Sequence, residues 1–140
     1  MTLSPEERQV VIGLRCRNAD DALSDAGVLL ERGSLRGAAN RIYYAAFHAV
    51  SALALSQGKM FAKHQGLISF FHADCVRAGK FDVKYGRILQ QAFEDRAEAD
   101  YEDDASFDQT TIRGRLADVK DLVEVIRAVV IPPLSADKTP

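Results

Sequence analysis

The stretch Gly37-Ala-Ala-Asn-Arg41-Ile-Tyr43-Tyr44-Ala-Ala-Phe-His48-Ala-Val-Ser-Ala-Leu-Ala-Leu55 is the most apolar helical segment of the chain. It carries one arginine and one histidine, seven positions apart. Each residue of an α-helix turns the chain by about 100°, so seven steps return to within about 20° of the starting direction. Arg41 and His48 are therefore predicted to share one helix face, about two turns apart. The alanines between them allow neighbouring helices to approach closely.

Further amphipathic helices are predicted on either side of this segment, so the sequence predicts an all-α, five-helix up-and-down bundle. Ser4, Pro5 and Glu7 form a helix start with a capping box. Gly33 ends this first helix, and Ser34 is predicted to cap the second. The predicted helices cover about residues 5–30, 35–56, 63–78, 85–99 and 110–131, the last one capped by Asp108 or Thr110.

The bulk properties of the chain are those of one globular domain. Its 140 residues suit a single core, and we assign residues 1–131 to the domain and 132–140 to a flexible C-terminal tail. No run of about 18 apolar residues and no apolar signal core is present. Cys16 and Cys75 stand in no metal or redox spacing. A cytoplasmic protein with reduced thiols is predicted, although the spacing leaves a disulfide open.

Three stretches of the chain resemble the HEPN-domain family. The segment from Ala38 to His48 resembles the second helix of that family. Lys63-His64-Gln-Gly-Leu-Ile-Ser-Phe-Phe71 looks like its helix with a lysine, a histidine and a glycine before apolar residues. The segment from Arg87 to Tyr101, which ends in Arg96-Ala-Glu-Ala-Asp-Tyr101, looks like the end of a later helix. The resemblance covers about residues 5–130, with the motifs in the family order.

The resemblance implies both a fold and a function. It implies an all-α bundle that forms a homodimer through its long helices. It also implies RNA- or nucleotide-linked work in a two-gene toxin–antitoxin or defence module, often beside a separate minimal nucleotidyltransferase. Ribonuclease members of the family carry an arginine, four to six further residues and a histidine. Arg41 and His48, with six residues between them, match this pattern.

The residue types fit RNA cleavage without a metal. A histidine titrates near neutral pH and can take the proton of the 2′-hydroxyl, which suits His48. An arginine binds phosphate with two parallel hydrogen bonds and can stabilise the charge of a phosphorane, which suits Arg41. In a dimer, two Arg41–His48 pairs can meet across the symmetry axis, so that the base and the acid come from different subunits. The net charge of −2 predicts no general attraction to nucleic acid, so any RNA contact has to come from a local patch.

Two other interpretations of these residues stay open. Arg41 and His48 can be structural contacts, with Arg41 paired to an acid of the fourth helix, either Asp95 or Glu98. The chain can also be a non-catalytic subunit that binds substrate or nucleotide beside a separate nucleotidyltransferase. In that interpretation Arg41 and Tyr44 bind the ligand. An exposed Arg41–His48 pair favours catalysis, and a covered pair favours a structural role.

Other polar residues are weaker candidates. Tyr43 and Tyr44 point about 100° apart, so one is predicted to pack in the core and the other to line the surface. Lys63 and His64 are candidate RNA or nucleotide contacts, although a surface position is the favoured interpretation of His64. The acidic residues from position 95 to 104 are interpreted as a solvated turn, in which Asp100 can pair with Arg96 or Arg87. No metal site and no cofactor is predicted.

Overall fold

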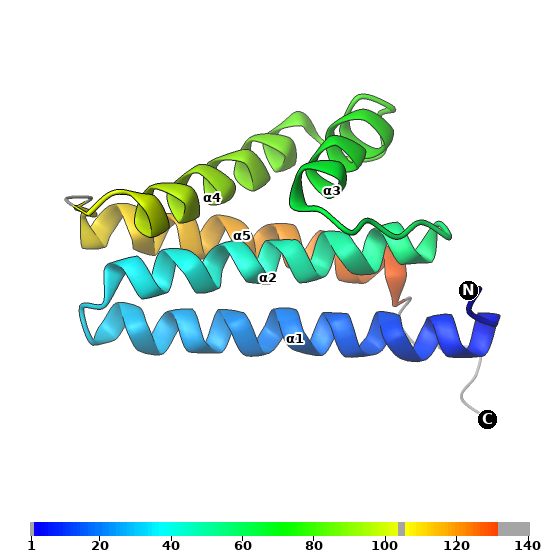
Figure 1. Ribbon diagram of the computed structural model, residues 1–140, viewed down its shortest axis with the longest axis horizontal. Helices are drawn as coiled ribbons and strands as arrows, with labels where there is room; N and C mark the ends of the chain where they lie inside the picture. The colour runs from blue at the N-terminus through cyan, green and yellow to red at the C-terminus, as the bar shows by residue number, and fades with distance from the viewer. Residues whose placement is uncertain (1, 104–105, 132–140) are drawn as a thin grey trace.

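The computed structural model describes residues 2–103 and 106–131, and Figure 1 shows how its helices are arranged. Within those residues the chain is all-α and forms no strand, which confirms the predicted fold class. The predicted tail at 132–140 and Asp104 of the acidic turn lie outside the described residues. The elements in order are α1 (Pro5–Glu31), α2 (Leu35–Ser56), α3 (His64–Phe70), the π-helical η1 (Phe71–Val76), α4 (Val83–Tyr101) and α5 (Gln109–Val130).

Local capping explains where several helices begin and end. The Ser4 hydroxyl accepts a hydrogen bond from the Glu7 amide, and the Glu7 carboxylate accepts one from the Ser4 amide, so the predicted capping box is present. Asp108 caps α5 through the Thr111 amide. Gly33 ends α1 with a φ of +80°, a conformation that glycine adopts without strain. Ser34 occupies the cap position of α2, but its side chain makes no capping hydrogen bond.

Helix α2 lies at the centre of the bundle. It packs against α1, α3, α4 and α5, and Figure 1 shows it running antiparallel to α1 along most of its length. Its alanines are buried, and their small side chains allow this close packing. Tyr43 is fully buried, whereas Tyr44 is only partly covered. The sequence predicted that one of the two tyrosines would pack in the core and the other would line the surface. The packing of these four helices against α2 thus fixes the orientation of the face that carries Arg41 and His48.

The third predicted helix differs from the structure in its second half. The α-helical geometry ends at Phe70 and the chain continues to Val76 as a π-helix, with the Arg77 amide donating to the His72 carbonyl, five residues back. The predicted helix over residues 63–78 is therefore too long and too regular. In Figure 1, α3 crosses one end of the bundle instead of running along it. This crossing brings the start of α3 over α2.

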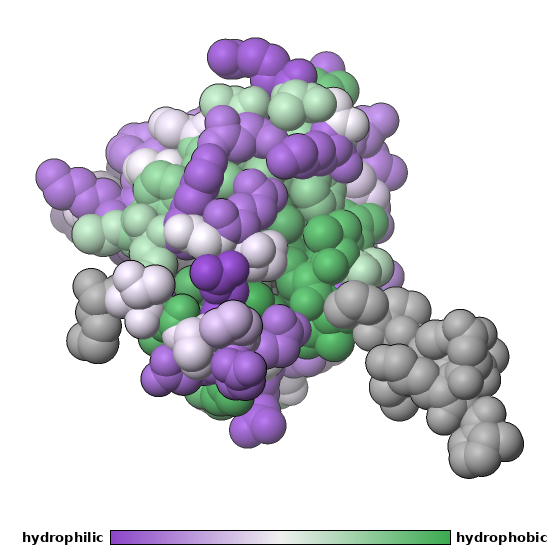
Figure 2. All heavy atoms as spheres, turned by 90° about the vertical axis from the view of Figure 1, so that its right-hand side faces the viewer, coloured by the Kyte–Doolittle hydropathy of each residue, from purple (hydrophilic) through white to green (hydrophobic). Residues whose placement is uncertain are grey.

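The cysteines are buried, and the exposed surface is mixed in character. Cys16 and Cys75 are buried free thiols. Figure 2 shows the end of the molecule that carries the N-terminus, where hydrophilic side chains cover much of the view and a hydrophobic area lies on one side. The exposed large apolar residues include Val10 and Val129. No helix among the described residues combines the length and the apolar character that crossing a membrane requires.

Candidate functional site

Arg41 and His48 lie on one partly exposed face of α2, with Tyr44 between them. The guanidinium carbon of Arg41 lies 5.0 Å from the centre of the Tyr44 ring, a cation–π contact. The ring centres of Tyr44 and His48 are 6.2 Å apart. Both candidate residues are half-buried, so they are neither fully covered nor free in solvent. The helical spacing therefore places them as the sequence predicted.

The side chain of Arg41 is hydrogen-bonded to a neighbouring amide side chain. Its Nε and Nη2 atoms donate to the side-chain oxygen of Asn40 over 3.0 and 2.8 Å. It forms no ion pair with the described residues. The predicted pairing with Asp95 is wrong, because Asp95 binds Arg115, and Glu98 does not pair with Arg41 either. The charge of Arg41 is thus oriented by a neutral group and is free to meet an anion.

His48 is close enough to two arginines, Arg15 and Arg41, for their charges to act on it. Burial lowers the pKa of His48 below its usual value, and the positive charges of Arg15 and Arg41 lower this pKa further. The imidazole is therefore neutral near pH 7 and can accept a proton. Its Nδ1 atom is buried and finds no hydrogen-bond partner among the described residues. Exchange of a proton with a ligand has to use Nε2.

His64 is the first residue of α3, and it is held against α2. Its Nδ1 atom lies 2.7 Å from the Tyr43 hydroxyl oxygen, and its ring stacks on Phe47 at 4.6 Å. The crossing of α3 over α2 covers part of the His64 ring, so the residue is partly exposed and not a free surface side chain as the favoured interpretation had it. Burial lowers the pKa of His64, and Arg96 lowers this pKa further. Burial raises the pKa of Tyr43 to about 12, so its hydroxyl stays neutral.

A second arginine reaches the same place from α4. The guanidinium carbon of Arg96 lies 5.6 Å from the centre of the Tyr44 ring, and its Nη2 donates weakly to the Tyr44 hydroxyl over 3.4 Å. Arg96 Nε also lies 2.8 Å from an oxygen of Asp100, an ion pair in which this N–H is not aligned for a hydrogen bond. We refer to Arg41, Tyr44, His48, His64 and Arg96 as the Tyr44 cluster.

The structure adds two arginines to the surroundings of the predicted site, and it leaves Lys63 exposed. Arg15 and Arg96 were not predicted as site residues. Arg96 carried a signal, since it stands in the stretch that resembles the family helix end, whereas Arg15 carried none. Lys63, a predicted RNA contact, occupies the cap position of α3 and is exposed without an ion pair to the described residues. The predicted pairing of Asp100 with Arg96 is present.

The described residues hold no group of three or more histidines, cysteines or acids that could bind a metal ion. Glu102 and Asp103 at the end of α4 are exposed. Their carbonyl oxygens accept hydrogen bonds from the Arg36 side chain. Glu102 and Asp103 thus fit the interpretation of a solvated acidic turn. That interpretation is wrong for Asp95, which lies within α4, is buried and pairs with Arg115.

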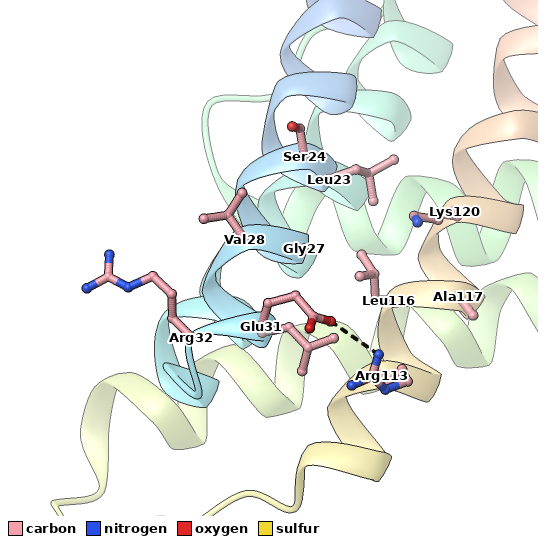
Figure 3. A pocket seen from close by; sticks show the side chains of 11 residues that line it. Leu23, Ser24, Gly27, Val28, Glu31, Arg32, Arg113, Leu116, Ala117 and Lys120 are labelled. Atoms are coloured by element: carbon pink, nitrogen blue, oxygen red, sulfur yellow. Dashed lines mark hydrogen bonds and ion pairs between the residues drawn. The ribbon is translucent and has the colours of Figure 1, made fainter.

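A groove of about 800 Å³ lies away from the Tyr44 cluster, between the second half of α1 and the first half of α5. Figure 3 shows Leu23, Val28 and Leu116 along it and the ion pair of Glu31 with Arg113 at its rim. Its lining includes no histidine or tyrosine. It offers apolar surface and charges of both signs but no group that titrates near neutral pH, so it is not the site of the predicted chemistry.

Comparisons with known proteins agree with the sequence motifs. The family model described as "HEPN domain" matches residues 12–130. A "UPF0332 protein" of Thermotoga maritima is 32% identical over 124 residues, which are 89% of this chain and 94% of that protein. A protein of Methanocaldococcus jannaschii named "Putative toxin MJ0605" is 37% identical over 99 residues, 71% of each chain. The "UPF0332 protein PH1297" of Pyrococcus horikoshii is 38% identical over 77 residues, 55% of this chain and 54% of that protein. With its model covering most of the sequence, the chain belongs to the HEPN domain family.

Proposed function

We propose that this chain is a metal-independent endoribonuclease that serves as the toxin of a two-gene module. The observation that carries the proposal is the position of Arg41, an arginine without an acidic partner among the described residues, on the same partly exposed face as His48. Membership of the HEPN family and the similarity to a relative named as a toxin support the same function.

The proposed reaction uses the two residues in different roles. Nε2 of His48 takes the proton of the 2′-hydroxyl, and the 2′-oxygen attacks the neighbouring phosphorus. The guanidinium of Arg41 binds the phosphate oxygens and stabilises the extra negative charge of the phosphorane. The bond from phosphorus to the 5′-oxygen then breaks. The products are a 2′,3′-cyclic phosphate and a free 5′-hydroxyl.

The charge distribution predicts how RNA is bound. The net charge is −2, so we expect RNA to be attracted by local cations, Arg41 and Arg96 of the Tyr44 cluster and Arg15 near His48. A small number of phosphate contacts gives weak binding. The affinity should also fall only gently with salt, because each contact to a single strand adds about 0.7 to the slope of log affinity against log salt concentration. Weak binding fits an enzyme that binds many different RNA chains and releases each one quickly.

The experiment is cleavage of a structured RNA mixture in excess EDTA by the wild-type protein, His48→Ala and Arg41→Gln. The matched controls are His72→Gln, which replaces a histidine of η1 outside the cluster, and Arg113→Gln, which replaces an exposed arginine. Circular dichroism checks the fold of each variant. We expect cleavage with cyclic phosphate ends by the wild type and both controls, and a loss of at least about 100-fold in the other two.

A wild-type protein that binds RNA but leaves it intact overturns the proposal. The Tyr44 cluster is then a binding face only, and affinity capture with a nucleotidyltransferase becomes the next measurement. Equal cleavage by the wild type and His48→Ala removes His48 from the mechanism. Light scattering on the same preparations measures the predicted homodimer, which is a separate question from the chemistry.

A further inference from the structure

The Tyr44 cluster contains two imidazoles from different elements. The ring centres of His48 and His64 lie 5.7 and 4.6 Å from the centre of Phe47, so they are no further apart than the sum of these distances. The Tyr44 ring is near both as well, with its centre 6.2 Å from His48 and 5.9 Å from His64. One phosphodiester with a hydrogen bond of about 3 Å on either side spans a comparable distance.

His64 is held in one orientation by two contacts. Tyr43 is fully buried, so its hydroxyl is a fixed partner for Nδ1 of His64 at 2.7 Å. The Phe47 ring stacks on the imidazole and fixes its plane. A hydroxyl can either donate or accept, so the bond to Nδ1 persists when His64 is neutral and when it is protonated. Nε2 is then the nitrogen available to a ligand.

Burial lowers the pKa of both histidines, and they differ in the hydrogen bonding of Nδ1 and in the charged groups around them. His48 has no partner on Nδ1 and faces Arg15 of α1 and Arg41 of α2, so its charged form gains no hydrogen bond there. His64 faces Arg96 of α4 and the phenols of Tyr43 and Tyr44, and its charged form keeps the bond to Tyr43. A phosphate bound between Arg41 and Arg96 would offset the positive charge of Arg96.

We propose that His64 is the general acid of the ribonuclease reaction and that one chain supplies both the acid and the base. This inference rests on the proposed function. His48 takes the 2′-hydroxyl proton, the bond from phosphorus to the 5′-oxygen breaks, and Nε2–H of His64 gives its proton to that oxygen. The two histidines finish in exchanged protonation states, and a proton exchange with water resets them. Tyr43 is a positioning residue for His64.

The decisive test compares two RNA substrates. One has the ordinary 5′-oxygen leaving group, and the other has sulfur in its place. A thiol has a pKa of about 8.5 and leaves as a thiolate without a proton, so the sulfur substrate needs no general acid. We expect His64→Gln to lose about 100-fold or more on the oxygen substrate and to cleave the sulfur substrate within a few fold of wild type. His48→Gln should fail on both.

Each other outcome has a distinct meaning. Equal losses of His64→Gln on both substrates, or no loss on either, overturn the role of His64 and leave the proposed function standing. A wild type that cuts neither substrate overturns the function and this inference together. Tyr43→Phe keeps the buried ring and removes the hydrogen bond. It should shift the alkaline limb of the pH–rate profile of the oxygen substrate, because that limb reports the loss of the proton from the general acid. A purely structural role of Tyr43 does not predict this shift.

A mixing experiment tests whether one chain holds the whole site. His48→Gln and His64→Gln proteins are unfolded together, refolded as a mixture and assayed on the oxygen substrate. If acid and base belong to one chain, every chain in the mixture lacks one of them and activity stays at the level of the separate variants. Recovery to about a quarter of the wild-type rate would show that the site is shared between copies and would overturn this part of the proposal.

Discussion

The guanidinium of Arg115 on α5 donates from Nε to an oxygen of Asp95 on α4 over 2.8 Å. Asp95 is only 7% exposed, and the Gln91 side chain donates to its other oxygen over 3.0 Å. This pair joins two helices of the bundle. It also occupies the carboxylate that the sequence offered to Arg41. Asp95 therefore joins α4 to α5 and does not pair with Arg41.

The Asp95–Arg115 pair should contribute measurably to stability. Asp95→Ala leaves the Arg115 guanidinium and the Gln91 amide without their acceptor in a mostly buried place. We expect the free energy of unfolding to fall by about 2–3 kcal/mol. Glu94→Ala, which replaces the exposed neighbour, should change it by less than about 0.5 kcal/mol. Urea denaturation measures both, and equal effects would contradict the argument.

Asn40 should matter more for activity than for stability. Asn40→Ala removes the oxygen that accepts both hydrogen bonds from Arg41. Arg41 then loses its fixed orientation, so we expect RNA cleavage to fall several fold, while the free energy of unfolding changes by no more than about 1 kcal/mol. Cleavage rates and urea denaturation of the same preparation check this. Full activity in the variant would show that Arg41 is oriented without Asn40.

The histidines should make stability depend on pH in one direction. The pKa of His48 is lowered by burial and by Arg15 and Arg41, and the pKa of His64 by burial and Arg96. Below the unfolded pKa of about 6.5 the unfolded chain binds more protons than the folded one. The free energy of unfolding should therefore fall as the pH is lowered from about 7 to 5.

Replacing both histidines tests that explanation. In the double variant His48→Gln and His64→Gln, the fall between about pH 7 and 5 should be smaller than in the wild type. Urea denaturation at a series of pH values and constant ionic strength measures the slopes. The same slope in both proteins would assign the pH dependence to other groups.

Two helical glycines should respond in opposite ways to the same substitution. A Cβ atom at Gly114 of α5 meets no atom within 4 Å, so Gly114→Ala should stabilise the protein by about 0.5–1 kcal/mol. A Cβ atom at Gly86 of α4 would lie 3.1 Å from Nδ1 and 3.2 Å from Cε1 of His72. Gly86→Ala therefore has to displace the His72 ring.

We expect Gly86→Ala to gain less than Gly114→Ala or to destabilise the protein, because strain offsets the better helix propensity. The midpoints of thermal unfolding of the two variants provide the comparison. A larger gain at Gly86 would show that His72 moves aside at no cost.

Much of the fold was predicted from the sequence because its signals are local. The capping box at Ser4, the cap at Asp108 and the positive φ of Gly33 depend on residues within one turn. The shared face of Arg41 and His48 is equally local, since the helical period fixes it wherever the helix packs. The change to π-helix at Phe71 was not predicted, because apolar spacing does not distinguish the two helix types over so short a stretch.

The sequence by itself determined the four long helices α1, α2, α4 and α5 and the arginine–histidine face of α2, because hydrogen bonds within a helix and its period depend on near neighbours. Only the tertiary structure decided which residues surround that face. His64 meets Tyr43 across 21 positions, and Arg96 meets Tyr44 across 52. Such contacts follow from how whole helices cross, and the packing of the complete core sets those crossings.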